Sequence, residues 1–220
     1  MPRRAALFDM DRTLIHESSA ALYTRYRRDL GEATYRDTLQ VGWWLLQYTL
    51  GWIDAERVAQ RALGIYRGTL ESEMIERCRI WFPQYVLALV ADEGRRAVRE
   101  HGEAGELLAI VTGSTHYAAR PLADELGIPH VVASEIATDE AGRFTGDVVP
   151  PLCLGLGKLA RTRALLERHG IELADATFYT DSITDLPLLE AVGRPIVVNP
   201  DPRLAREARR RGWPVQRWKP

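Results

Sequence analysis

The chain has 220 residues, of which 46% are hydrophobic and 27% are charged, and its formal net charge is −1. This length supports one sizeable core, or one core with a smaller attached domain. The balanced charge argues against a nucleic-acid-binding protein, which usually shows a basic excess. The arginines near the C-terminus stand among acidic residues, so we interpret them as a solvated helix face.

Two further features concern the cellular setting. The two cysteines, Cys78 and Cys153, lack metal-type spacing and suit a reducing cytoplasm better than a disulfide scaffold. The apolar run at residues 5–8 is too short for a signal peptide. The apolar segment at residues 41–53 is too short to span a bilayer, and a buried helix is expected there, with an interfacial helix as the alternative. We therefore expect a cytoplasmic protein without membrane association.

The expected elements begin with a short buried strand at residues 4–8. From about residue 17 to 89, apolar residues recur at helical spacing, and glycines separate the segments. This stretch is expected to be a helical module, with its last two segments at residues 71–81 and 82–90.

After this module, expected strands and helices alternate. The strands are expected at 106–111, 130–133, 176–180 and 195–198, and a β-hairpin at 135–149. The helices are expected to end near 101 and to span 116–126, 158–169, 186–192 and 202–211. Repeated strand–helix units indicate an α/β fold of three layers, in which a parallel sheet is covered on both faces. The helical module interrupts this pattern and is therefore an insert after the first strand.

The first chemical motif, Asp9-Met10-Asp11, follows the first strand. Residues two apart in an extended segment point the same way, so Asp9 and Asp11 should project together. Two close carboxylates repel each other, and one pKa rises unless a cation intervenes. The pair suits one ionised nucleophile and one proton carrier. A solvated turn after an edge strand is the alternative.

The second and third motifs are candidates for phosphate binding. Thr112 and Gly113 follow an apolar strand, where a hydroxyl and backbone N–H groups can donate to a phosphate oxygen. Lys158 follows a glycine-flexed turn and can bring an ammonium to the same place. Taken singly, these features are also typical of an ordinary turn or helix cap and of a surface charge.

The fourth motif places Asp181 after a strand and Asp185 four residues later. Magnesium needs a few oxygen ligands and keeps water or substrate oxygens for the rest. The carboxylates of Asp9 and Asp181, with the carbonyl of Asp11, would meet that need. Asp185 has a second interpretation as the cap of the next helix.

In their order along the chain, the four motifs resemble those of the haloacid dehalogenase superfamily. The helical insert between the first and second motifs resembles the phosphoserine-phosphatase-like branch, subfamily IB. The resemblance covers the whole chain and implies a Rossmann-like core from residues 1–16 and 90–220 with a helical cap from 17–89. Thr180 stands where the family usually has glycine, and a good strand residue is expected to be tolerated there if φ is negative.

This resemblance implies a Mg²⁺-dependent phosphomonoesterase that passes through an aspartyl-phosphate intermediate. The implied roles are Asp9 as nucleophile, Asp11 as acid and base, Thr112, Gly113 and Lys158 as phosphate ligands, Asp9, Asp11 and Asp181 as metal ligands, and Asp185 as support for the metal site.

The substrate is expected to be a small phosphate ester, with Glu17 and Arg61 as candidate contacts in the cap. A phosphoserine-like substrate would use an acidic residue for its amine and an arginine for its carboxylate. A histidinol-phosphate-like substrate would need Glu17 but not the arginine. A lipid-phosphate phosphatase, suggested by the tryptophans of residues 41–53, and a phosphotransferase or mutase are the alternatives.

Overall fold

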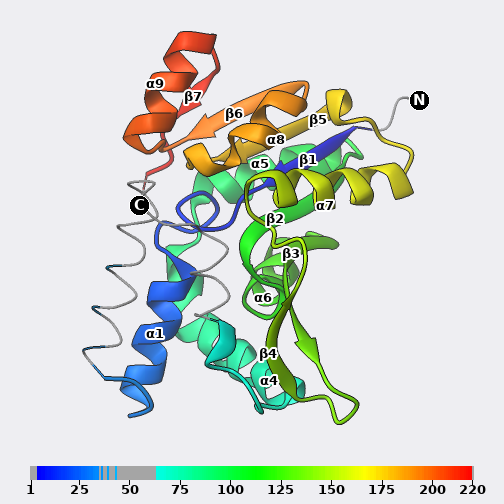
Figure 1. The fold of residues 1–220 in the computed structure, drawn as a ribbon. Helices are drawn as coiled ribbons and strands as arrows, with labels where there is room; N and C mark the ends of the chain where they lie inside the picture. Colours follow the sequence, from blue (N-terminus) through cyan, green and yellow to red (C-terminus); the bar gives the residue numbers. More distant parts are fainter. Residues whose placement is uncertain (1–3, 35, 37–38, 40–42, 44–62, 220) are drawn as a thin grey trace.

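The computed structural model describes residues 4–34, 36, 39, 43 and 63–219. Their strands form one sheet in the order β4-β3-β2-β1-β5-β6-β7 (Figure 1). Among the described strands only β4 runs antiparallel to its neighbour. The strands are β1 Ala5–Phe8, β2 Leu107–Thr115, β3 His130–Thr138, β4 Phe144–Val149, β5 Ala176–Thr180, β6 Arg194–Val198 and β7 Val215–Gln216.

The helices of the core follow the strands in alternation, as expected. They are α5 Asp92–Glu103, α6 His116–Leu126, α7 Gly155–Arg168, α8 Leu186–Ala191 and α9 Pro202–Arg211, with short 3₁₀ turns η3 Leu173–Asp175 and η4 Ile183–Asp185. No helix within the described ranges is long and apolar enough to cross a membrane.

Strand β1 shows why both faces of the sheet are covered. Its residues Ala5–Phe8 are fully buried, and successive side chains of a strand point to opposite faces. Ala5 and Leu7 join a core with α7, α8 and α9, whereas Ala6 and Phe8 join a core with α5 and α6. A parallel strand buried on both faces is therefore apolar throughout. The predicted three-layer α/β fold is confirmed.

The described part of the insert between β1 and α5 is largely helical, and most of it lies below β1 and beside β4 in Figure 1. It contains α1 Ser19–Asp29, α4 Glu71–Trp81, a π-helical turn η1 Phe82–Val86 and a 3₁₀ turn η2 Leu87–Leu89. The prediction of a single helix over residues 82–90 is wrong, because this stretch consists of two short helical turns. Pro83 lies in η1 and has no backbone N–H to donate, which disfavours a regular α-helix.

Strand β3 is continuous from His130 to Thr138. The expected short strand and the first half of the expected hairpin are thus one element. The hairpin that β3 forms with β4 reaches the insert, because Gly68 N donates to Phe144 O (2.8 Å) and Phe144 N donates to Thr69 O (2.9 Å). This contact ties the later half of the insert to the edge of the sheet.

Strand β2 also runs further than expected, to Thr115, through residues expected to form a turn. Its pairing with β3 shifts register between Val111 and Thr115. Such an irregularity bends a strand locally. Because β2 is paired with β1 and Ile110 lies opposite Phe8, the second motif lies at the edge of the sheet where β1 ends.

The C-terminal segment returns to the core at Trp218, which is 4% exposed. Asn199 Nδ2 donates to Trp218 O (2.8 Å), and Trp218 N donates to Asn199 Oδ1 (3.1 Å). The indole lies 5.7 Å from the ring of Tyr179, centroid to centroid. This docking and strand β7 were not predicted from the sequence.

We expect Trp218→Ala to lower the free energy of unfolding by about 3 kcal/mol, because it removes a buried aromatic ring and leaves a cavity. Urea unfolding of both proteins measures the difference. Val215→Ala, at a side chain that is 47% exposed, is the control and should change stability by no more than about 0.5 kcal/mol. Equal effects of the two substitutions would contradict the role of Trp218 in the core.

Candidate active site

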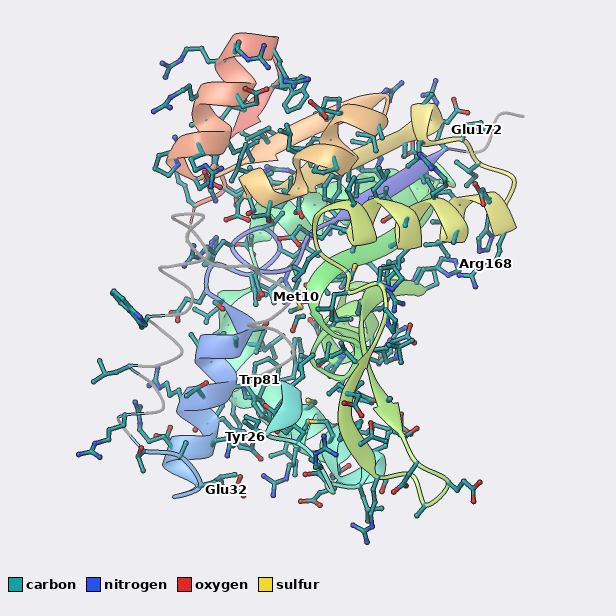
Figure 2. The ribbon with its side chains drawn as sticks, viewed as in Figure 1. Met10, Tyr26, Glu32, Trp81, Arg168 and Glu172 are labelled. Carbon is teal, nitrogen blue, oxygen red and sulfur yellow. The ribbon has the colours of Figure 1, made fainter. Side chains whose placement is uncertain are left out.

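The motif residues meet at the edge of the sheet where the parallel strands end. Asp9 follows β1 and Asp181 follows β5, and these strands are paired with Phe8 opposite Tyr179. Asp9 N donates to Tyr179 O (2.8 Å), which extends the pairing by one residue. In open α/β sheets this edge is where ligands bind. Figure 2 labels Met10, beside Asp9 in sequence, where the sheet meets the insert.

Lys158 connects two of the aspartates. Its Nζ lies 2.9 Å from Asp9 Oδ1 and 2.7 Å from Asp185 Oδ2. All three side chains are almost fully buried. Asp185 makes no capping hydrogen bond to α8, so its helix-cap interpretation is wrong. The lysine that the sequence singled out therefore reaches Asp9, and Asp185 holds it from the other side.

Electrostatics at these groups is dominated by burial and by the surplus of carboxylates. Burial raises the pKa of Asp9 to about 7, with Asp185 and Asp11 adding to the rise and Lys158 opposing it. Burial favours the neutral amine of Lys158, but the facing carboxylates of Asp185 and Asp9 outweigh it and raise the lysine pKa above its usual value. The lysine is thus charged at neutral pH. The positive charge near Asp9 is too small to offset its burial, so Asp9 ionises less easily than an exposed aspartate.

Ser19, at the start of α1, holds the second aspartate and was not identified from the sequence. Its N–H donates to Asp11 Oδ1 (2.7 Å) and its hydroxyl lies 3.1 Å from Asp11 Oδ2. The same hydroxyl lies 3.1 Å from Ser114 Oγ, and Ser114 N donates to Thr112 Oγ1 (3.1 Å). Burial raises the pKa of Asp11, and the two donors from Ser19 partly offset this rise. Ser19 thus joins the insert, the second aspartate and the second motif.

Gly113 allows the second motif to approach the start of α7 closely. A Cβ at Gly113 would lie 2.5 Å from Leu154 Cδ2, which is closer than real Cβ atoms come. The buried Ser134 fixes the same approach, because its hydroxyl donates to Gly113 O (3.0 Å) and accepts from Cys153 N (3.1 Å). Ser134 was not identified from the sequence. A side chain at position 113 would therefore require the Leu154 side chain to move, next to the helix that carries Lys158.

Asp181 is 6% exposed, and no described residue donates a hydrogen bond or ion pair to its carboxylate. Burial and the facing carboxylates of Asp9 and Asp185 raise its pKa well above the usual value. Asp201, another residue not identified from the sequence, fixes the backbone here. Its N–H donates to Asp181 O (2.9 Å), and its Oδ2 accepts from Ile183 N (2.7 Å).

These carboxylates suit a divalent cation. No group of three or more His, Cys, Asp or Glu side chains within the described residues is placed to hold a metal ion. However, Mg²⁺ typically takes one or two carboxylates, with water and substrate oxygens completing its shell. Asp9 Oδ2 and the Asp181 carboxylate are nearly buried and lack donors among the described residues. The available donors are oxygens, which suit magnesium rather than a soft metal.

The two substrate candidates of the insert are Glu17 and Arg61. Glu17 is exposed and lies two residues before Ser19, at the start of α1. Arg61 and nearly all of residues 41–53 lie outside the described residues. The structure therefore brings together the residues of the four motifs, with Glu17 close to them in sequence.

Comparison with known proteins places these features in a family. Residues 6–190 match the haloacid dehalogenase-like hydrolases. A histidinol-phosphatase of Neisseria meningitidis is 28% identical over 99% of this chain and 100% of its own. A phosphoserine phosphatase of Mycobacterium tuberculosis is 31% identical over 96% of this chain and 70% of its own. An "Inhibition of morphological differentiation protein" of Streptomyces azureus is 32% identical over 98% and 78%, respectively.

Solved structures show the same relationship. A protein of unknown function from Bordetella pertussis superposes with a TM-score of 0.87 at 31% identity, covering 98% of both chains. A phosphoserine phosphatase with an analogue of its phospho-aspartyl intermediate superposes with a TM-score of 0.72, covering 94% of this chain and 91% of that chain. At 18% identity the latter shows likeness of fold alone. The match over residues 6–190 shows that this chain belongs to the haloacid dehalogenase superfamily of hydrolases, and its fold is that of the phosphoserine-phosphatase-like members.

Proposed function

We propose that this phosphatase hydrolyses small phosphate esters through an aspartyl-phosphate on Asp9, with Mg²⁺ as cofactor. The observation that carries the proposal is the buried chain Asp9–Lys158–Asp185, with Asp11 beside it and Asp181 without a donor among the described residues. A carboxylate nucleophile needs a cationic partner and a separate proton carrier. The arrangement supplies candidates for each of these parts.

The proposed reaction assigns one step to each aspartate. Asp9 Oδ2 attacks phosphorus and the ester bond breaks, while Asp11 gives its proton to the leaving oxygen. Asp11 then takes a proton from the water that attacks the aspartyl-phosphate, which restores Asp9 and releases inorganic phosphate. Lys158, Thr112 and Gly113 bind the phosphoryl oxygens throughout.

A magnesium ion held by Asp9, Asp181 and the Asp11 carbonyl would stabilise negative charge on the phosphoryl group. Asp185 would support this site through its contact with Lys158. The raised pKa values of Asp9 and Asp181 support a cation here, because both carboxylates are more easily ionised beside positive charge.

The insert, residues 17–89, is proposed to act as a cap over residues 1–16 and 90–220. Its support is the contact of Ser19 with Asp11, which brings α1 to the reacting groups. Within the cap, Glu17 is proposed to bind a positively charged amine of the substrate. The free thiols of Cys78 and Cys153 are buried, which agrees with a cytoplasmic location.

The substrate is proposed to be an amine-bearing phosphomonoester, either histidinol-phosphate-like or phosphoserine-like. The histidinol-phosphatase matches this chain over its full length, which favours the first. The phosphoserine phosphatase is slightly more similar in sequence, at 31% identity against 28%, which supports a phosphoserine-like substrate.

Asp9→Asn is expected to abolish phosphate release, because an amide cannot act as the nucleophile. Asp11→Asn should lower kcat by about 100-fold, the usual cost of losing an acid–base group. Release of inorganic phosphate from an aryl phosphate measures both effects. Asp147→Asn changes an exposed carboxylate and serves as the control. Full activity of Asp9→Asn would exclude the aspartyl-phosphate route.

Magnesium is expected to stabilise the protein more at pH 8 than at pH 5. A carboxyl with a raised pKa binds its proton more tightly in the folded chain than in the unfolded chain. Without metal, the contribution of Asp9 to the free energy of unfolding therefore falls as pH rises from 3.8 to about 7. Bound magnesium offsets this loss by favouring the ionised carboxylates.

Thermal unfolding with magnesium and with a chelator, at both pH values, measures this difference. Asp181→Asn should remove most of the stabilisation by magnesium at pH 8, whereas Asp147→Asn should keep it. An equal gain at both pH values, or an undiminished gain in Asp181→Asn, would contradict the proposed ligands.

Glu17→Gln is expected to raise KM by about 10-fold for phosphoserine or histidinol phosphate, because a hydrogen bond to a charged group contributes about 1.5 kcal/mol or more. KM for an amine-free aryl phosphate should not change. Glu140→Gln, at another exposed glutamate, is the control. The same assays compare the two natural substrates, and phosphate release without an acceptor argues against a phosphotransferase. Equal KM changes for both substrate classes would remove Glu17 from amine binding.

A further inference from the structure

Thr180 is the last residue of β5, immediately before Asp181, and it is fully buried. Strand side chains alternate, so Thr180 points to the same face as Phe178. The Phe178 ring lies 5.8 Å from the Nζ of Lys158. Thr180 therefore lies on the face of the sheet along which the lysine reaches the candidate active site.

The Thr180 hydroxyl makes two hydrogen bonds whose directions are fixed by chemistry. Ser182 N–H lies 3.2 Å from Thr180 Oγ1 and can only donate to it. Asp185 Oδ2 lies 2.6 Å from Thr180 Oγ1 and accepts from it, as it also accepts from the ammonium of Lys158. A hydroxyl has one proton, so this proton goes to Asp185 and a lone pair takes the N–H of Ser182. The orientation of the hydroxyl has no alternative among these partners.

This hydroxyl shares its acceptor with the lysine. Asp185 Oδ2 accepts from both Thr180 Oγ1 and Lys158 Nζ, at 2.6 and 2.7 Å. The two donors hold the same carboxylate oxygen, and the carboxylate in turn holds the ammonium, which lies 2.9 Å from Asp9 Oδ1. Lys158 has three N–H donors and uses one each on Asp9 and Asp185. The third has no described acceptor and is the one that a phosphoryl oxygen can take.

We propose that Thr180 is a positioning residue, whose hydroxyl fixes Asp185 so that Lys158 presents its third N–H to the phosphoryl group. This inference rests on the proposed function of Asp9 and Lys158 and goes beyond it. A glycine, alanine or valine at position 180 cannot donate to Asp185. The Asp185 carboxylate then loses one of its two donors among the described residues, and the position of the ammonium that it binds is less well fixed.

The test compares Thr180→Val with Thr180→Ser. Valine keeps the volume and the strand preference but removes the hydroxyl, whereas serine keeps the hydroxyl and loses a methyl group. Loss of an outer partner at a catalytic site typically costs 10- to 100-fold in activity. We expect kcat of Thr180→Val to fall about 10-fold with KM changed by less than about 3-fold, because no direct substrate contact is lost. Thr180→Ser should retain kcat within about 3-fold of the parent protein.

The control is Thr162→Val in α7, four residues from Lys158. Thr162 is fully buried, and its hydroxyl has no hydrogen-bond partner in the described part of the chain. This variant should keep its kcat. Thermal unfolding of each variant checks that the assay temperature lies below its unfolding transition.

The outcomes separate this inference from the function on which it rests. A packing role would make serine worse than valine, since serine leaves a methyl-sized cavity, and this order would overturn the proposal. Equal losses in Thr162→Val and Thr180→Val would also overturn it. Asp9→Asn is assayed alongside: if it is inactive while Thr180→Val is fully active, only the positioning role fails. If Asp9→Asn is active, the proposed function itself fails.

Discussion

The candidate site depends on one buried ammonium among more carboxylates than it can neutralise. Lys158 holds Asp9 and Asp185 at hydrogen-bond distance, while Asp11 and Asp181 lie close enough to affect the titration of Asp9 or to be affected by it. Removing one partner of a buried ion pair leaves an uncompensated charge and typically costs about 3–5 kcal/mol. The close approach allowed by Gly113 and the start of α7 at Gly155 both serve to bring this ammonium to the end of β1.

Much of the fold could be predicted because its signals are local. Four elements have the expected bounds, namely helices 71–81, 116–126 and 202–211 and strand 176–180. The spacing of apolar residues and nearby glycines or prolines indicate where such elements begin and end. The errors arise where tertiary pairing decides. Residues 112–115 look like a turn but continue β2 through a register shift, and β3 runs on into the hairpin because β4 supplies a partner. The docking of Trp218 depends on Asn199, nineteen residues earlier, and has no local signature.

The site was predictable where strand ends deliver side chains, as for Asp9, Asp181 and the second motif. Ser19 and Asp201 were missed because a serine at the start of a helix, or an aspartate before Pro202, is typical of ordinary caps. Ser134 was missed because a single serine inside a strand has no local sequence signal. Asp201 does cap α9, through Arg203 N and Leu204 N, and also fixes the loop of Asp181. The sequence around Asp201 indicates only its role as a helix cap, and the contact with the loop of Asp181 becomes visible only in the structure.

The insert is attached to the rest of the molecule by more than its two chain connections. On one side, the hairpin binds it through Phe144 and Gly68, and Tyr117 donates to Glu71. On the other side, α1 contributes Ser19 to Asp11. Movement of α4 would therefore break contacts that take no part in the chemistry. Movement of α1 would remove both Ser19 donors from Asp11. A movement of α1 that admitted substrate would thus also change the hydrogen bonding of the proposed proton carrier, so substrate entry and the environment of Asp11 would be coupled.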